Sequence, residues 1–208
     1  SGEYFTHVVP VYDGLMIQSA ITTVELGGCD VTDSLVSLLM RLGDYSPSEA
    51  RKNAEWLKRE YGTFEPPDDT VIVDPLKKKG TSEQRKVKKS VKVLFDPTPI
   101  GKRMGFVEAC QASYEKMDVD IRDEVFSTIV LAGGNTMFPG IEDELSRRLD
   151  GCFGGGTVDV LGLPNRSDLS WVGGAQFAVN PAFRDQWVTK EDFDEVGSYL
   201  IRHHCYYF

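Results

Sequence analysis

An apolar strand followed by two glycines and a helix constrains the fold of this chain more than any other feature. Residues 126–131 have the sequence FSTIVL, and Ala132-Gly133-Gly134-Asn135 follows directly. The β-branched run predicts a strand, the double glycine a tight turn, and residues 139–149 a helix. Glycines also let the backbone approach a ligand, and a helix N-terminus offers free N–H groups. The turn therefore has two interpretations, a simple connection or a phosphate-binding element.

Strand and helix signals alternate along the rest of the chain. Residues 6–13 and 15–26 are typical of a β-hairpin, because Asp13-Gly14 between them favours a type I′ turn. A helix is expected from Asp30 or Thr32 to Leu42, before Gly43, and a second from the Ser46-Pro47 start to Tyr61. Further expected elements are helices at 105–117, 171–179 (opened by Gly173-Gly174) and 189–196 (capped by Thr189), and a strand at 157–163. This mixture predicts an α/β fold. We expect residues 6–26 to pair beside the strands at 127–131 and 157–163 in one sheet.

Residues 64–95 differ from the rest in composition. A short strand is expected at 70–73, and residues 87–94 alternate enough to be the second strand of a hairpin. Between and within these segments, lysine and arginine recur over positions 77–92. The stretch is either a solvated hairpin or a basic patch for an acidic partner, and charge runs more often form solvated faces.

Composition narrows the function classes. The net charge of −9 and the pI near 4.9 make nucleic acid an unlikely partner, because neutralising phosphates needs basic residues. No apolar run is long enough to cross a membrane, which predicts no membrane association. The four cysteines form no CxxC pair, which favours reduced thiols and a cytoplasmic protein. A zinc site at His203-His204-Cys205 is the less favoured alternative.

The N-terminal segment is a second candidate for phosphate binding. Ser1-Gly2-Glu3-Tyr4-Phe5 precedes the first expected strand and contains small residues. A turn of this kind can present successive backbone N–H groups to an anion. By itself the segment is also compatible with an ordinary chain start.

Taken in order, these segments resemble the actin family. SGEYFTHVVPVYDG is similar to its second phosphate loop, ELGGCDVTDSL to a helix start in its fourth subdomain, and DVDIRDEVFSTIVLAGGNTMFPGIEDEL to the block around its adenine pocket. SWVGGAQFAV and FRDQWVTKEDFDEVG are similar to its C-terminal helices. The resemblance covers nearly the whole chain except 64–94. It implies the C-terminal half of an actin-like ATPase: a ribonuclease H-like lobe (1–26 and 103–170), a reduced helical and hairpin insertion (27–102), and C-terminal helices (171–208) that pack on the other lobe.

The resemblance also implies site roles and cofactors. ATP or ADP with Mg²⁺ is the expected ligand, bound weakly or not at all by these residues alone. His7 takes the position that orders the attacking water, and no residue is assigned to the metal. The expected phosphate contacts are Gly2, Glu3, Tyr4 and Phe5, and the positions around ribose and adenine are Gly28, Lys58, Arg59, Gly134, Asn135, Met137 and Phe138.

Three residues depart from the family pattern. Tyr4 stands where the family's loop has a second glycine, Arg59 replaces an acidic ribose partner, and Ser167 replaces a lysine near the adenine. The sequence also begins after the family's catalytic aspartate, and the first phosphate loop precedes it. Because phosphoryl transfer needs clamps on both sides of the phosphates, we expect no hydrolysis above background from residues 1–208 alone.

Three function hypotheses follow. The favoured one is a divergent actin-like subunit of a cytoskeletal filament or scaffold. The alternatives are an actin-fold ATPase of which this is the C-terminal half, and a basic-hairpin module for an acidic partner. Residues 171–208 carry many large apolar side chains, so we expect them to contact other actin-like subunits or the N-terminal half. The competing expectation is that they fold back onto the strands at 130–163.

Overall fold

The computed structural model describes residues 1–42, 45–65, 90–153, 156–181, 183 and 187–204. These residues form two compact units, Ser1–Ser167 and Asp168–Phe208. The predicted strand at 70–73, most of the basic stretch 77–92 and the candidate zinc ligand Cys205 lie outside the described residues. No described helix has the length and apolar character needed to cross a bilayer.

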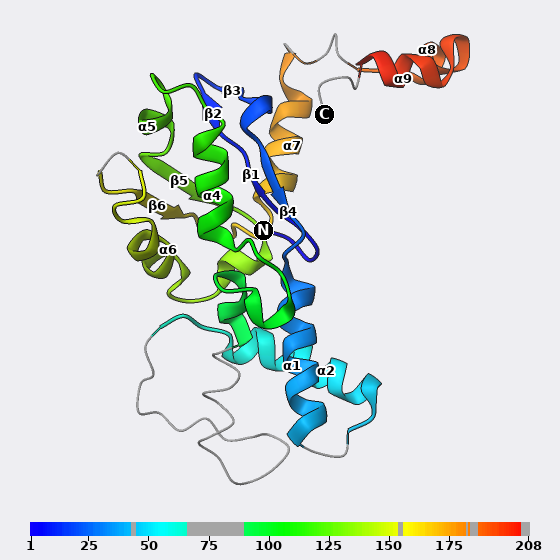
Figure 1. Ribbon diagram of the computed structural model, residues 1–208. Coiled ribbons are helices and arrows are strands. Elements are labelled where there is room, and N and C mark those ends of the chain that lie inside the picture. The colour runs from blue at the N-terminus through cyan, green and yellow to red at the C-terminus, as the bar shows by residue number, and fades with distance from the viewer. Residues whose placement is uncertain (43–44, 66–89, 154–155, 182, 184–186, 205–208) are drawn as a thin grey trace. The chain divides into compact units, whose positions relative to one another are not determined.

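The N-terminal hairpin is confirmed, with one interruption (Figure 1). β1 (Thr6–Val8) pairs antiparallel with β4 (Thr22–Val24), and β2 (Val11–Tyr12) pairs antiparallel with β3 (Leu15–Met16). Asp13 and Gly14 both have positive φ, 50° and 76°, as a type I′ turn requires. A 3₁₀ turn at Gln18–Ala20 separates β3 from β4, so the predicted single return strand is wrong. Ala20 is fully buried there, which explains why the chain bends inward.

Two helices follow and pack against each other: α1 (Gly28–Leu42) and α2 (Pro47–Tyr61) (Figure 1). The α2 start is confirmed as a capping box, in which Ser46 and Glu49 bond reciprocally. Helix α1 begins earlier than the predicted Asp30 or Thr32. Its first N–H groups have acceptors outside the helix, because Gly28 donates to the Gly2 carbonyl and Cys29 to the Glu3 carbonyl.

The predicted strand at 87–94 is wrong over its described part. Residues 90–91 are helical and continue into a 3₁₀ turn at Lys92–Leu94. Val91 and Leu94 are both fully buried, and their spacing of three suits a helical turn rather than a strand. Their side chains belong to the main core, which decides the local conformation.

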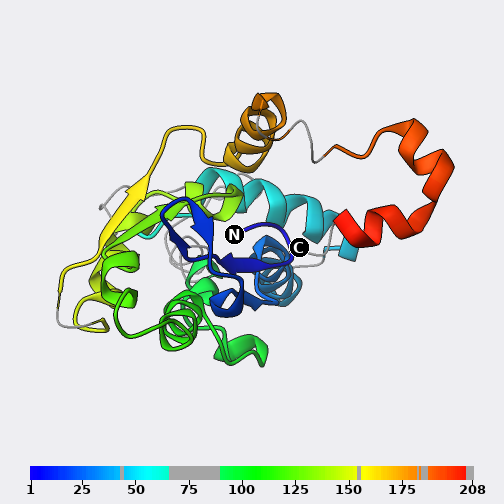
Figure 2. The ribbon, with the colours of Figure 1, turned by 90° about the horizontal axis from the view of Figure 1, so that it is seen from above.

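The remaining elements of the first unit include the predicted helices and strands, with shifted ends, and also a short helix and two 3₁₀ turns that the sequence did not predict. They are a 3₁₀ turn (Thr98–Ile100), α4 (Phe106–Glu115), α5 (Arg122–Val125), β5 (Thr128–Leu131), a 3₁₀ turn η4 (Gly134–Met137), α6 (Ile141–Leu149) and β6 (Asp159–Gly162). β5 and β6 pair in parallel, which confirms that they share a sheet (Figure 2). β5 begins after the predicted Phe126 because that ring is buried between Tyr114 and Phe153.

The prediction that the hairpin strands extend the β5–β6 sheet is wrong for the described residues, which form three two-stranded sheets. β1 and β4 pair with each other, and α4 packs against both. The hairpin and β5 meet through loop and side-chain contacts around Ser1 and Asn135 instead of a backbone ladder. The mixed α/β character is confirmed, while the ribonuclease H-like detail and the lobe-and-insertion division stay predictions.

One apolar core joins these elements. Its fully buried large members come from α1, α6, the helical segment at 90–94 and the residue before Gly27: Leu26, Val31, Leu35, Val91, Leu94, Ile141 and Leu149. Edge-to-face aromatic contacts extend it through Phe64, Phe95 and Phe106. This shared core holds the segments of the candidate site in register.

The second unit contains α7 (Leu169–Val179), α8 (Lys190–Val196) and α9 (Ser198–His204). The predicted Thr189 cap of α8 is confirmed, with Asp192 as its partner. Helix α7 begins at Leu169, so Gly173 and Gly174 lie inside it and do not open it as predicted. None of the described residues of this unit is buried.

Candidate functional site

The segment Gly2–Phe5 forms a tight turn at the entrance of β1. The Gly2 N–H donates to the Phe5 carbonyl over 2.9 Å and closes the turn. Within the described part of the chain, the N–H groups of Glu3, Tyr4 and Phe5 have no hydrogen-bond acceptor, and all three residues are exposed. Three successive free N–H groups are the donor set that an anion such as a phosphate requires.

The start of α1 clamps this loop from one side. The N–H groups of Gly28 and Cys29 donate to the carbonyls of Gly2 and Glu3, over 3.0 and 2.8 Å. A Cβ on Gly27 would overlap the Glu3 carbonyl, so only glycine permits this approach. The first N–H groups of α1 are therefore used to hold the loop and are not left for a ligand.

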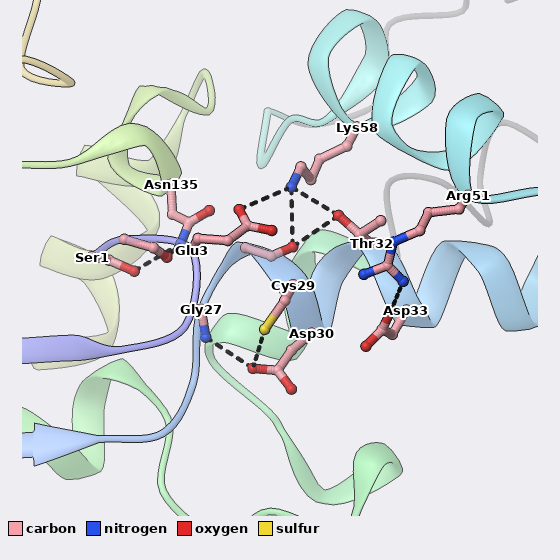
Figure 3. A network of polar contacts seen from close by, with 12 residues as sticks. Ser1, Glu3, Gly27, Cys29, Asp30, Thr32, Asp33, Arg51, Lys58 and Asn135 are labelled. Carbon is pink, nitrogen blue, oxygen red and sulfur yellow. Dashed lines mark hydrogen bonds and ion pairs between the residues drawn. The ribbon is translucent and has the colours of Figure 1, made fainter. Parts of the chain in front are cut away.

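Lys58 reaches the same point from α2 (Figure 3). Its Nζ donates to the Gly28 carbonyl over 3.1 Å and to Thr32 Oγ1 over 2.8 Å, and it lies 3.8 Å from Glu3 Oε2. The ammonium therefore neutralises the one acidic side chain of the loop. Thr32 is a site residue that the sequence reasoning missed. Its spacing of four from Gly28 was the available signal, because a helical threonine can bond the carbonyl four residues back.

The turn after β5 clamps the loop from the other side (Figure 3). Asn135 Nδ2 donates to Ser1 Oγ over 3.0 Å and to the Gly2 carbonyl over 2.6 Å, and the backbone nitrogen of Ser1 donates to the Ala132 carbonyl over 2.7 Å. Gly133 has φ +96°, and a Cβ there would overlap the Ser1 carbonyl. A Cβ on Gly28 would lie 2.8 Å from both Asn135 Oδ1 and Glu3 Oε2, so the three segments converge on Gly28.

Other predicted site residues lie at the edges of this assembly. His7 is exposed on β1, where its Nδ1 bonds Thr23 Oγ1 over 2.9 Å and its ring stacks on Phe5. Arg59 is exposed on α2, one residue after Lys58 and so about 100° around the helix from it. Tyr4 and Phe5 are exposed in the loop.

Met137 and Phe138 are adjacent in sequence, but only Met137 is exposed. The Met137 side chain is 44% exposed, and the space around the Cα of Gly134 is open. Phe138 is buried against Phe64, and its ring lies so close to Gly62 that a Cβ there would overlap it. The space around the Phe138 ring is therefore filled by the chain itself. The accessible surface of this turn is therefore made by Gly134 and Met137.

The charges around the site are balanced inside the chain. Asp30 accepts from the Gly27 N–H over 2.9 Å and from Lys102 Nζ over 2.7 Å. Burial and the neighbouring carboxylates of Asp30 and Glu3 raise the pKa of the Cys29 thiol, which keeps it neutral. No group of three or more metal-ligating side chains lies together in the described part of the chain. The free N–H groups of Glu3, Tyr4 and Phe5 are thus a donor set suited to an anion.

The model of the family described as Actin matches residues 76–206, more than half of the chain. The match includes β5, η4 and β6, and with them Gly134, Asn135, Met137 and Phe138. The loop at Gly2–Phe5, Gly28 and Lys58 lie before the matched range, and Asn135 within that range bonds the Gly2 carbonyl of the loop.

Proposed function

Because the chain belongs to the actin family, we propose that residues 1–167 form one half of a site for ATP or ADP with Mg²⁺. The observation that carries this proposal is the row of N–H groups at Glu3, Tyr4 and Phe5, which have no acceptor among the described residues. These groups would hold the terminal phosphates. The clamps from Gly28 and Asn135 support it, because a preformed loop binds without an ordering cost.

Of the other residues in the proposed site, some would contact the ligand and others would hold the loop in place. Gly134 and Met137 would border the ribose and adenine, since they form the accessible part of the turn. Lys58 and Asn135 would act mainly by holding the loop, because their polar atoms already have partners in the chain. Mg²⁺, when bound, neutralises charge on the phosphates. His7 would hold a water near the loop through the ring nitrogen that Thr23 leaves free.

We propose that the nucleotide serves as a structural ligand for these residues and is not turned over by them alone. Phosphoryl transfer needs electrostatic clamps on both sides of the phosphates and a metal. The loop at Gly2–Phe5 supplies one side. Binding should therefore be weak, and hydrolysis should stay at background.

Titration of ATP into the ¹⁵N-labelled chain tests the proposal. We expect ATP at millimolar concentration to shift the amide signals of Glu3, Tyr4 and Phe5 most. Tyr4→Pro removes one of these donors and should abolish the shifts, whereas Tyr4→Ala keeps the N–H and should retain them. Shifts confined to other residues would contradict a phosphate site here, and phosphate release that disappears in His7→Ala would contradict the structural role.

We further propose that the protein is a cytoplasmic subunit of a cytoskeletal filament or scaffold. Residues 171–208 would contact other actin-like subunits or the N-terminal half of an actin fold. This rests on the second unit, where no described side chain is buried although Trp171, Phe177 and Trp187 are large and apolar. Apolar surface of that kind normally marks an interface.

Light scattering of the chain tests this interface. We expect self-association that Trp187→Ser relieves, because the exposed indole would contribute buried apolar area on contact. Ser170→Ala, an exposed substitution in the same unit, is the matched control. A stable monomer in which Trp171 and Trp187 are shielded from a fluorescence quencher would contradict the proposal.

A further inference from the structure

Arg166 lies after β6 and contacts the turn after β5 with both its backbone and its side chain. Its carbonyl accepts from the Gly133 N–H over 2.8 Å, and its Nε donates to the Thr136 carbonyl over 2.8 Å. Its Nη2 pairs with Glu142 Oε1 over 2.7 Å, at the start of α6. The side chain is only 12% exposed. One residue thus contacts the turn at two points and the following helix α6 at a third.

Local features of β6 bring Arg166 to this position. Asn165 has φ +55°, a conformation that asparagine tolerates better than most residues, and it reverses the chain after the strand. A Cβ on Gly162 would overlap the Glu142 carboxylate and lie 2.5 Å from Arg166 Nη1. The ion pair therefore passes directly across the Cα of Gly162. The guanidinium directs Nε at Thr136 and Nη2 at Glu142 in a fixed planar geometry, whereas the three donors of a lysine ammonium all come from one nitrogen atom.

The effect of these contacts falls on the segment Gly133–Phe138. Arg166 fixes Gly133 and Thr136. Asn135, between them, holds the loop Gly2–Phe5 (the phosphate-loop candidate) through the Gly2 carbonyl. Gly134 and Met137 remain accessible on a backbone that is fixed on both sides. The base end of the site thereby has a set shape before any ligand arrives.

We infer that Arg166 is a positioning residue that gives the site its preference for a nucleotide over a bare polyphosphate. The inference rests on the proposed function and deepens it. Arg166 itself would not touch the ligand, because its donors are directed at Thr136 and Glu142. It would act by holding Gly134 and Met137 where a ribose and a base can pack, while the N–H groups of the loop bind phosphate independently.

Hydrogen exchange without ligand tests the positioning role. Arg166→Met keeps an unbranched side chain but removes the Nε and Nη donors. Arg166→Lys keeps the positive charge but lacks the planar guanidinium. We expect amides of residues 133–138 to exchange about tenfold faster in Arg166→Met, as the loss of hydrogen bonds from a charged donor implies, and to an intermediate extent in Arg166→Lys. Exchange as slow as in the unmodified chain in both variants would overturn the inference, whatever the ligand does.

Binding of ATP and of inorganic tripolyphosphate, compared by NMR titration, tests specificity. The unmodified chain should bind ATP more tightly, and Arg166→Met should lose that difference while its tripolyphosphate affinity stays unchanged. Retention of the difference in Arg166→Met would overturn the inference and leave the proposed function standing. Binding of neither ligand by the unmodified chain would overturn the proposed function. If Arg166→Met does not fold, Glu142→Gln replaces it, because this variant removes only the carboxylate that pairs with Arg166. It should reduce the preference for ATP over tripolyphosphate to a smaller extent.

Discussion

Residues 1–167 and residues 168–208 both contain helices rich in apolar side chains, yet among the residues that the structure describes only those of the first unit form a buried core. In the first unit, Leu35 and Leu149 are completely buried. In the second, helix α7 has the sequence LSWVGGAQFAV without one charge, and Trp171 is 76% exposed and Val179 81% exposed. A core requires apolar faces from several elements that meet, and chains of about 40 residues rarely provide them alone. Apolar content therefore does not by itself predict burial.

Truncation of an apolar residue in each unit should give the largest contrast. We expect Leu35→Ala to lower the free energy of unfolding by about 2–5 kcal/mol, the usual cost of a cavity in a packed core. Val179→Ala should change it by less than about 0.5 kcal/mol, because the side chain is already in solvent. Urea denaturation followed by circular dichroism measures both. An equal loss from the two substitutions would mean that the second unit has a core of its own in solution.

Replacing a glycine by alanine should change stability in opposite directions in the two units. Gly133→Ala should lower the free energy of unfolding by about 3 kcal/mol, since φ is +96° and the new Cβ overlaps the Ser1 carbonyl. Gly174→Ala, inside α7 with no atom near its Cβ position, should instead raise helix stability by about 0.5–1 kcal/mol. Thermal unfolding and helix content report the two effects. Gly134→Ala is the control beside Gly133, and a loss there as large as that of Gly133→Ala would refute the steric reason.

Helix caps should show where the units are alike. Ser46 caps α2 and Thr189 caps α8, each in a reciprocal capping box. We expect Ser46→Ala and Thr189→Ala each to cost about 1 kcal/mol of local helix stability. Hydrogen exchange in the first turn of each helix measures this. Similar losses would show that the units differ in packing and not in local helix signals, whereas an effect in α2 only would show that α8 does not persist in solution.

The smallest expected effect concerns Glu144 on α6, in the first unit. Burial alone would raise the pKa of Glu144, but hydrogen bonds from Arg147 and Arg148 outweigh it and hold the pKa below its ordinary value of 4.5. Because the pKa is lower in the folded state, the carboxylate stabilises the fold above that value and loses this contribution as the pH falls below it. The stability difference between the unmodified chain and Glu144→Gln should therefore shrink by about 0.5 kcal/mol from pH 6 to pH 3. A difference that does not change with pH would contradict the assignment.

Local signals predicted the elements well where a short-range rule decided them. The Asp13-Gly14 turn and the caps at Ser46 and Thr189 each depend on neighbours within three or four residues, and each is confirmed. The prediction of a strand at 87–94 was wrong because Val91 and Leu94 are buried in a core built from residues distant in sequence. That burial outweighs the partial alternation of the segment. Helix α1 starts early because the Gly2 and Glu3 carbonyls, far away in sequence, accept its first N–H groups.

The candidate site was predictable in part for the same reason. The double glycine at Gly133-Gly134 indicated a close backbone approach, and the structure has one, to Ser1. That partner was not predictable, because it lies at the other end of the first unit. Arg166 gave no sequence signal, since its role depends on Thr136 and Glu142 being brought beside it by the fold.

The bonds between Asn135 and the first residues have a consequence for synthesis on the ribosome. Ala132 and Asn135 hold Ser1 and Gly2 across 131 to 134 positions. At about 5–20 residues per second, the ribosome needs on the order of ten seconds to add that stretch. For that interval the phosphate-loop candidate has been made but lacks the partner that fixes its shape. The order of translation therefore makes this loop one of the last parts of the first unit to fold, although the ribosome adds it well before Asn135.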